Sequence, residues 1–271
     1  MPEGDTIFRA ARTLRQALEG ETVTAVATTV GQVRRLGEQR LVGQTVGAVE
    51  PRGKHLLIWF SPSDLALHTH MRMTGSWHLY RHGQRWRKPR HLLRFRLETA
   101  QWLALCFSAP VIELLSADQV ARHPSLVALG PDALGKEPDL HEVRRRLDAA
   151  GNTTIGEALL DQRVMAGVGN VYKNEVLFIH QVDPWTPVAE VDAETRDALL
   201  DTAVRLLRSS VRPGQVRRAT TGAAGMGDDL HVYGRHRHPC PRCQRPIAVA
   251  RQGDQGRLTY WCRSCQGPGR P

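Results

Sequence analysis

The sequence predicts an α+β protein of two domains: an N-terminal antiparallel β-sandwich with flanking helices, then a helical domain with a C-terminal β-hairpin zinc finger. Three observations support this. The 271 residues exceed the usual size of one compact domain. Strand-like alternation fills the first half of the chain, and helical periodicity dominates the second. Four of the five cysteines form two close pairs near the end.

The β-sandwich domain is predicted over residues 2–128. Apolar residues recur at helical spacing from Thr6 to Leu18, and Gly20 is a plausible stop for this opening helix. Residues 93–97 alternate between apolar and charged side chains, which is the clearest strand pattern in the chain. Further strands are predicted over residues 22–29, 45–49, 55–60, 65–70, 76–80 and 103–107.

The helical domain, with its linker, is predicted over residues 129–222. Gly and Pro mark residues 130–138 as the linker. Helices are predicted over residues 140–149, 155–165, 171–179 and 193–211. After Gly214 the composition shifts to Gly, Thr, Arg and His, and a zinc finger region is predicted over residues 223–267.

The charge balance favours a polyanionic partner. Lys and Arg outnumber Asp and Glu by 37 to 27, which gives a formal net charge of +10 and a pI near 10.0. Ribosomal proteins, membrane-surface proteins and ordinary basic enzymes share such a balance, so charge alone does not identify the partner. The sequence has no secretory signal and no apolar run of membrane-spanning length. We therefore expect a cytoplasmic protein, nucleoid-associated if bacterial, with no membrane partner.

The cysteine pairs predict one structural Zn²⁺. Cys240 and Cys243 are separated by two residues, as are Cys262 and Cys265, and 18 residues lie between the pairs. Each pair can chelate one metal ion from a tight turn, and the intervening residues can form a hairpin. Because four protein ligands close the coordination shell, this zinc is expected to hold the fold and to take no part in chemistry. No organic cofactor is expected.

Four motifs together resemble one family. The Pro2-Glu3-Gly4 start, the turn containing Lys54, the glycine-rich turn that ends at Asn170, and the terminal four-cysteine hairpin follow the order found in the formamidopyrimidine-DNA glycosylase/endonuclease VIII family. The resemblance runs from residue 2 to Cys265. It implies a β-sandwich, a helix-two-turns-helix domain and a zinc finger, with damaged DNA bound between the domains.

The resemblance implies that Pro2 is the nucleophile. Removal of Met1 exposes a secondary amine that can attack a sugar C1′ and form a cationic iminium intermediate. An α-amino group has a reference pKa of about 8, so part of it is neutral at physiological pH. Glu3 is then placed for general acid/base catalysis, protonating the sugar ring oxygen as the ring opens. Taken alone, Met-Pro is a common start, and an acidic residue before a helix is unremarkable.

The resemblance assigns phosphate contacts to three further residues. Lys54 follows Gly53 and precedes a strand, and the matching lysine of the family binds phosphate beside the lesion. Asn170 is expected to cap a helix and to add an amide donor to a phosphate site. Arg257, five residues before Cys262, matches the finger arginine that contacts the phosphates of the lesion.

A loop over residues 70–75 matches the segment that fills the gap left by an everted nucleotide. Met73 is the first candidate for the inserted side chain, with Arg72 and Thr74 beside it. A methionine in a strand-rich domain is otherwise more often a core residue. The neighbouring His68 and His70 are interpreted as structural and not catalytic.

Two departures from the family pattern bear on the substrate. Thr6 stands where the family usually has glutamate, which places in doubt how the opening helix is anchored. Residues 108–113 read Ser-Ala-Pro-Val-Ile-Glu, without the Arg and Phe that complete the wedge of the purine enzymes. This absence favours an endonuclease VIII type that removes oxidised pyrimidines.

The leading hypothesis is a monomeric base-excision glycosylase with β,δ-elimination AP lyase activity. Two alternatives stay open at this point. One is an oxidised-purine glycosylase of the same family, acting on 8-oxoguanine or formamidopyrimidine. The other is a non-catalytic zinc-ribbon DNA-binding protein, for which a free N-terminal proline would have no use.

Overall fold

The structure is a computed structural model that describes all residues except 1, 37, 216–217, 219, 221–229 and 270–271. The chain divides into two compact units, Met1–Ala128 and Leu129–Pro271. The predicted boundary between the helical domain and the finger, after residue 222, lies outside the described residues.

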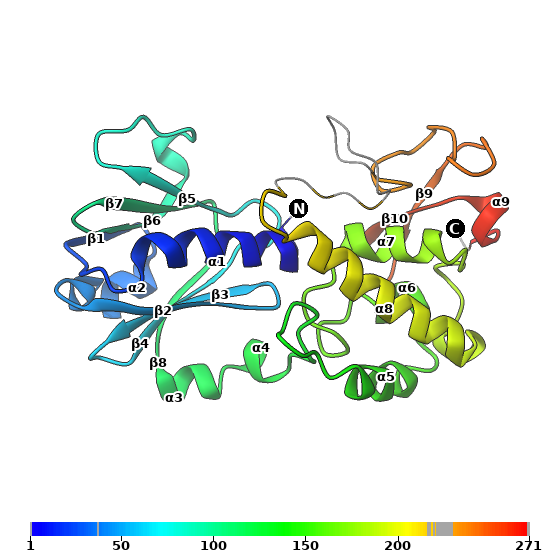
Figure 1. Cartoon of the computed structure of the whole chain (residues 1–271), viewed down its shortest axis with the longest axis horizontal. Helices are drawn as coiled ribbons and strands as arrows, with labels where there is room; N and C mark the ends of the chain where they lie inside the picture. The colour runs from blue at the N-terminus through cyan, green and yellow to red at the C-terminus, as the bar shows by residue number, and fades with distance from the viewer. Residues whose placement is uncertain (1, 37, 216–217, 219, 221–229, 270–271) are drawn as a thin grey trace. The chain divides into compact units, whose positions relative to one another are not determined.

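The first unit contains two antiparallel four-stranded sheets, with strand orders β1-β6-β7-β5 and β2-β3-β4-β8 (Figure 1). The strands are β1 (Ala25–Thr28), β2 (Thr45–Arg52), β3 (His55–Ser61), β4 (Leu65–His70), β5 (Ser76–Arg81), β6 (Leu93–Glu98), β7 (Trp102–Phe107) and β8 (Val111–Ser116). Short helical segments connect or follow them: α2 (Gly31–Leu36), η1 (Glu38–Leu41), η2 (Arg90–Leu92), α3 (Ala117–Ala121) and α4 (Pro124–Val127).

Helix α1 (Gly4–Leu18) lies along both sheets and completes their common core (Figure 1). Its buried face includes Ile7 and Leu14, which join side chains from both sheets in one apolar cluster. Such burial is what stabilises an amphipathic helix of this length. The helix ends at the predicted place, because Gly20 adopts a positive φ of 82°.

The predicted strands of this unit are confirmed, with small shifts at their ends, and the fold class is confirmed with them. The first strand is shorter than expected, since only Ala25–Thr28 pairs with β6. Strand β8 was not predicted, although Ile112 and Leu114 alternate inward as a half-buried strand should. Helices α2, α3 and α4 were not predicted either. Each has six residues or fewer, too short for a periodic signal.

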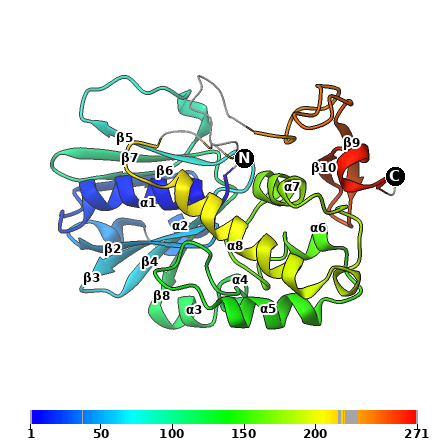
Figure 2. The ribbon, with the colours of Figure 1, turned by 45° about the vertical axis from the view of Figure 1, so that its right-hand side comes forward.

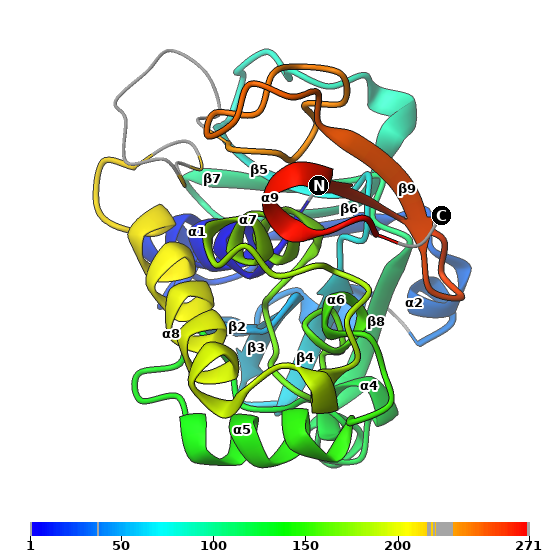
Figure 3. The same ribbon diagram turned by 90° about the vertical axis from the view of Figure 1, so that its right-hand side faces the viewer.

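The second unit is a group of helices followed by a β-hairpin (Figure 2). Its elements are α5 (Leu140–Ala149), α6 (Ile155–Ala158), α7 (Asn170–Ile179), η3 (Val188–Glu190), α8 (Ala193–Ser210), β9 (Ala248–Gln252), β10 (Arg257–Trp261) and α9 (Arg263–Gln266). Side chains cap three of the helices in the usual way, Asp139 for α5, Thr154 for α6 and Asp192 for α8. Figure 3 shows strand β9 and helix α9 near the C-terminus.

The prediction of a helix over residues 155–165 is wrong beyond Ala158. The Asp161 carboxylate accepts a hydrogen bond from the backbone N–H of Arg163 at 2.9 Å. The Gln162 side chain donates to the carbonyls of Leu160 and Val168 at 2.8 and 2.9 Å. These local bonds compete with the helical ladder and turn the chain toward α7.

Within the described part of the chain, no helix combines the length and the apolar character needed to cross a bilayer.

Candidate active site and cysteine cluster

The N-terminal motif lies at the start of α1. Glu3 is the N-cap residue, with an extended backbone, and its carbonyl accepts hydrogen bonds from the N–H groups of Thr6 and Ile7 at 2.9 and 3.1 Å. Its side chain is fully buried, while Pro2 is half-buried. The amides at a helix N-terminus favour a negative charge, so this position suits a carboxylate. The expected helix start at Thr6 is two residues late.

Thr6 lies in the first turn of α1, beside a buried carboxylate. Asp5 is fully buried and forms an ion pair with Arg9 at 2.9 Å. The Thr6 hydroxyl donates a hydrogen bond to the same Asp5 carboxylate at 3.3 Å. A carboxylate therefore stands in the first turn one position before the place where relatives usually carry glutamate, and Thr6 contacts it.

Lys54 occupies a two-residue turn between β2 and β3. Arg52 and His55 face each other as the last pair of the hairpin. Gly53 takes the first position of the turn with a φ of 56°, a conformation that favours glycine. The turn leaves the Lys54 side chain half-buried at the end of the hairpin, where its ammonium can contact a phosphate.

The loop after β4 separates the two methionines of its sequence. Met71 is buried in the core, whereas Met73 is 57% exposed, which is unusual for a large apolar side chain. Arg72 adopts a positive φ of 43°, and its N–H donates to His70 Nδ1 at 3.1 Å. The Thr74 hydroxyl donates to the Ser108 carbonyl at 3.0 Å. Met73 is thus exposed between two residues, Arg72 and Thr74, that hydrogen bonds hold in place.

The connection between β7 and β8 is short. Only residues 108–110 separate the two strands, and Ala109 is buried. This is the segment in which the sequence lacks the Arg and Phe of the purine enzymes. In the described structure the connection has no extended loop that could add a second wedge beside Met73.

In the second unit, Gln162 organises the glycine-rich turn before Asn170. In addition to the two bonds that it donates, its side-chain oxygen accepts a hydrogen bond from the Gly167 N–H at 3.1 Å. The N-cap of α7 is Gly169, and Asn170 makes no capping bond. The expected helix-cap role of Asn170 is therefore wrong. Its Nδ2 instead donates to the Leu258 carbonyl on β10 at 2.7 Å, and Leu258 directly follows Arg257 in the sequence.

Polar side chains of α7 hold the C-terminal segment. Lys173 Nζ donates to the Thr259 hydroxyl at 2.5 Å, and Asn174 Oδ1 accepts from the Tyr260 N–H at 2.7 Å. Glu175 is fully buried and accepts hydrogen bonds from three consecutive backbone N–H groups, those of residues 231–233, at 2.7 to 2.9 Å. Burial would raise the pKa of Glu175, but its hydrogen bonds, led by that from His231, lower it. The roles of Gln162, Lys173 and Glu175 were not predicted, and the available signal was a polar side chain within an apolar helix pattern.

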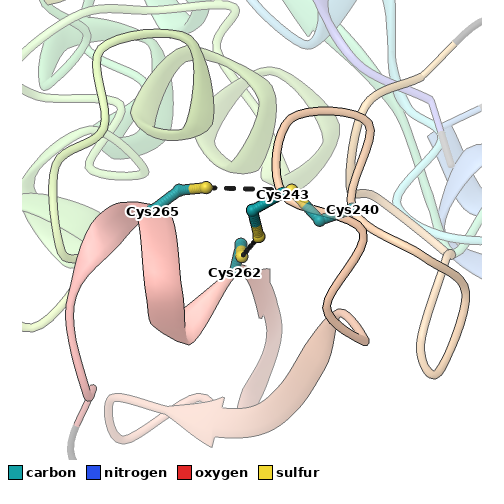
Figure 4. A group of neighbouring side chains, drawn as sticks. All are labelled: Cys240, Cys243, Cys262 and Cys265. Atoms are coloured by element: carbon teal, nitrogen blue, oxygen red, sulfur yellow. Dashed lines mark hydrogen bonds between the residues drawn. The ribbon is translucent and has the colours of Figure 1, made fainter.

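The four predicted cysteines converge (Figure 4). Their sulfur atoms all lie within 4.8 Å of one another, with separations of 3.9 Å between Cys240 and Cys265 and 3.4 Å between Cys243 and Cys262. A tetrahedral zinc with Zn–S bonds of about 2.3 Å places its sulfurs about 3.8 Å apart, so the cluster fits such an ion. A hydrogen bond from the Arg245 backbone lowers the pKa of Cys243 to about 7, which favours the thiolate that binds metal.

Comparisons with known proteins agree over both units. The formamidopyrimidine-DNA glycosylase N-terminal domain model matches residues 1–110, and the H2TH domain model of the same enzyme matches residues 129–221. The chain is 44% identical to a probable endonuclease 8 2 of Streptomyces coelicolor, over 99% of this chain and 95% of that protein. It is 38% identical to the DNA-(apurinic or apyrimidinic site) lyase Nei2 of Mycolicibacterium smegmatis, over 98% and 99%.

The chain belongs to the formamidopyrimidine-DNA glycosylase/endonuclease 8 family. Its nearer likeness to proteins named endonuclease 8 confirms the branch expected from residues 108–113, and the chain is a glycosylase/lyase of that family. The fold agrees too. Lactococcus lactis formamidopyrimidine-DNA glycosylase, solved with abasic-site DNA, matches with a TM-score of 0.81 at 24% identity, covering 97% of this chain and 99% of that one.

The predicted site residues of this family member fall into two groups. The first unit carries Pro2, Glu3, Lys54 and the loop of Arg72, Met73 and Thr74. The second unit carries Asn170, Arg257 and the four cysteines. Membership over nearly the whole chain argues against a non-catalytic zinc-ribbon protein.

Proposed function

We propose that this enzyme removes oxidised pyrimidines from DNA and then cleaves the strand, with the amino group of Pro2 as the nucleophile. The observation that carries the proposal is the N-terminal motif, in which Pro2 directly precedes a fully buried carboxylate at the start of α1. A buried carboxylic acid beside an amine is suited to move protons during ring opening.

The chemistry proceeds in two stages. The neutral Pro2 nitrogen attacks the sugar C1′ and the base leaves with the bonding electron pair. The attacking nitrogen then loses its proton to water, and Glu3 protonates the ring oxygen as the C1′–O4′ bond opens. The resulting iminium cation withdraws electrons and acidifies the C2′ proton. Loss of that proton expels the 3′ phosphate by β-elimination, and a second elimination releases the 5′ phosphate. Hydrolysis of the iminium then restores Pro2.

The remaining residues bind the substrate in this proposal. Lys54 and Arg257 contact phosphates next to the lesion, and Asn170 adds an amide donor there. Met73, with Arg72 and Thr74, fills the gap in the base stack. The cysteine cluster binds one Zn²⁺ that holds the hairpin, and the enzyme acts on damaged DNA as a monomer.

The short β7–β8 connection favours pyrimidine lesions over purine lesions. Without a second wedge, the Met73 loop alone must support the orphaned base opposite the lesion. The wild-type Lactococcus lactis enzyme that matches with a TM-score of 0.82 at 25% identity was solved with a formamidopyrimidine lesion, N7-benzyl-Fapy-dG. An oxidised-purine glycosylase is therefore the alternative to be tested.

Borohydride trapping on a panel of lesions tests the nucleophile and the substrate together. We expect a covalent adduct with abasic, 5-hydroxycytosine and thymine glycol duplexes, and faster single-turnover cleavage of 5-hydroxycytosine than of 8-oxoguanine. Mass spectrometry must show that Met1 is absent. A chain with one extra residue before Pro2, whose nitrogen is then an amide, should lose trapping by on the order of 10³-fold or more.

Glu3→Gln separates the acid/base step from DNA binding. The amide keeps the shape of the side chain but cannot donate a proton as an acid, so the glycosylase rate should fall by about 10²–10⁴. The affinity for DNA with an uncleavable abasic analogue should stay within about twofold. Full trapping by the extended chain would contradict the proposal for Pro2, and preference for 8-oxoguanine would favour the purine alternative.

A further inference from the structure

Three side chains that take no part in the proposed reaction converge in the first unit. His68 on β4 and Glu113 on β8 are directly opposite each other in the sheet, so their side chains share one face. His123, the N-cap residue of α4, approaches the same carboxylate. Glu113 Oε2 lies 2.8 Å from His68 Nδ1 and 3.2 Å from His123 Nε2. The nearest ligand atoms of all three side chains lie within 4.8 Å of one another.

We propose that His68, Glu113 and His123 form a second metal site, which binds Zn²⁺ or another first-row divalent cation through two imidazoles and one carboxylate. Two histidines with one acidic residue is a common ligand set for zinc, and it leaves one coordination position for water. Ligands of one tetrahedral zinc lie about 3.3–3.5 Å apart, so shifts below about 1 Å would seat the ion. The site is separate from the cysteine cluster, which lies in the other unit.

The protonation states suit a cation. His68 is 1% exposed, and burial disfavours the charged imidazolium, so a neutral ring with a lone pair for a ligand bond suits this position. Without a metal, both histidines must donate a proton to the same carboxylate oxygen. A cation at the centre would replace those two shared protons and bond all three groups at once.

The surroundings of His68 match those of a metal-ligating histidine. His68 Nε2 lies 2.8 Å from Nδ1 of the buried His55. When Nδ1 of His68 binds metal, its proton sits on Nε2 and can be donated to His55 Nδ1. A hydrogen bond from the second ring nitrogen fixes the orientation of a metal-binding imidazole, and losing it typically weakens metal affinity by 10–100-fold.

The other two ligands are open to solvent. The Glu113 and His123 side chains are 25% and 17% exposed. His123 also lines a surface depression with neighbours from α3, including Asp118 and Gln119. A cation can therefore enter from this side. The His123 Nδ1 atom is buried and has no hydrogen-bond partner among the described residues, so Glu113 is the group that holds the ring.

Metal counting on the full-length, untagged chain tests the site without any measure of catalysis. At buffered micromolar free zinc we expect two equivalents per chain, and one in His123→Gln and Glu113→Gln. Co²⁺ provides an independent signature, because the cysteine cluster gives intense thiolate charge-transfer bands and the proposed site gives weak d–d bands only. His55→Phe keeps the ring volume but removes the acceptor, and should weaken the second equivalent by 10–100-fold.

His141→Gln is the matched control, since His141 is exposed on α5 in the other unit and should leave both equivalents unchanged. Circular dichroism and the unfolding midpoint show whether each variant folds. The unfolding midpoint of the wild-type chain should keep rising as free zinc is raised beyond the level that fills the cysteine cluster. Over the same range the midpoint of folded His123→Gln should stay constant. One equivalent in the wild-type chain, or a second equivalent that survives both ligand substitutions, would show that the cluster is a hydrogen-bonded network without a metal.

Discussion

The two units bury polar side chains in different ways. In the first unit, Glu113, His68 and His55 form a chain of side-chain contacts, and the His70 ring lies 4.5 Å from that of His55. In the second unit, Lys173, Asn174 and Glu175 extend from one helix and bind the segment that carries the cysteines. The first network joins titratable groups to one another, and the second pairs most of its groups with backbone or hydroxyl partners.

Because of this difference, we expect the first network to be sensitive to pH and the second to be sensitive to the removal of a side chain. The histidine network is sensitive to protons, because burial holds the pKa of each of these imidazoles below the value of an unfolded histidine. The α7 network responds to the removal of a side chain, because each lost acceptor leaves buried N–H groups without a bond. The candidate phosphate-binding residues Asn170 and Arg257 depend on the second network, while Lys54 and the Met73 loop adjoin the first.

The largest effect is expected from Glu175→Ala. The substitution removes the acceptor of three backbone N–H groups and of the Thr220 hydroxyl. At about 1–3 kcal/mol for each buried donor left unsatisfied, the second unit should lose 3 kcal/mol or more of unfolding free energy. Hydrogen exchange of peptides from α7 in increasing urea measures this loss. Glu194→Ala, on the first turn of α8, is the exposed control, and equal stability of the two variants would contradict the role assigned to Glu175.

Acid should affect the first unit before the second. Burial is the main cause that lowers the pKa of His55 to about 2 and of His70 to about 4, from an unfolded value near 6.5. In mild acid the unfolded chain therefore binds more protons than the folded chain. The stability contributed by neutral His55 is complete above pH 6.5 and is lost as the pH falls toward its folded pKa. Glu175, whose pKa is lowered, keeps its contribution until the pH falls below 4.5.

Hydrogen exchange at about pH 7 and about pH 5, corrected for the intrinsic rate, resolves the two units. Peptides from β3 and β4 should lose about 2 kcal/mol of protection for one buried neutral histidine, while peptides from α7 should change less. In His55→Phe the protection of β3 and β4 peptides should change less between the two pH values. If peptides from α7 and from β3 lost similar protection between the two pH values, the proposed difference in acid sensitivity between the units would be wrong.

The features that could be predicted from the sequence are those with a regular spacing of residues along the chain. Helix α1, most strands of the sandwich and each of the two cysteine pairs follow from patterns over a few neighbouring residues. The contacts that the sequence did not predict depend on register between distant segments. His68 and Glu113 are 45 residues apart and meet only because β8, an unpredicted strand, pairs with β4. Likewise, Asn170 binds Leu258 across 88 residues, a partner that its local role as a presumed cap did not suggest.

The smallest effect, on DNA affinity and its salt dependence, is expected from Lys54→Gln and from Arg257→Gln. Each change should remove one phosphate contact, weaken DNA binding equally for all sequences and lower the salt slope of log K by about 1. Fluorescence anisotropy with an uncleavable abasic duplex at several salt concentrations measures both quantities. Arg251→Gln, on the neighbouring strand β9 with an exposed side chain, is the control for the finger.

The double variant tests whether Lys54 of the first unit and Arg257 of the second contact different phosphates. If Lys54 and Arg257 contact separate phosphates, the double variant should lose about 2 from the slope, and the two affinity losses should add. A slope that falls by only about 1 in the double variant would mean that both side chains neutralise the same phosphate. An unchanged slope in either single variant would remove that residue from the DNA-binding surface, because counterion release follows the number of phosphates neutralised.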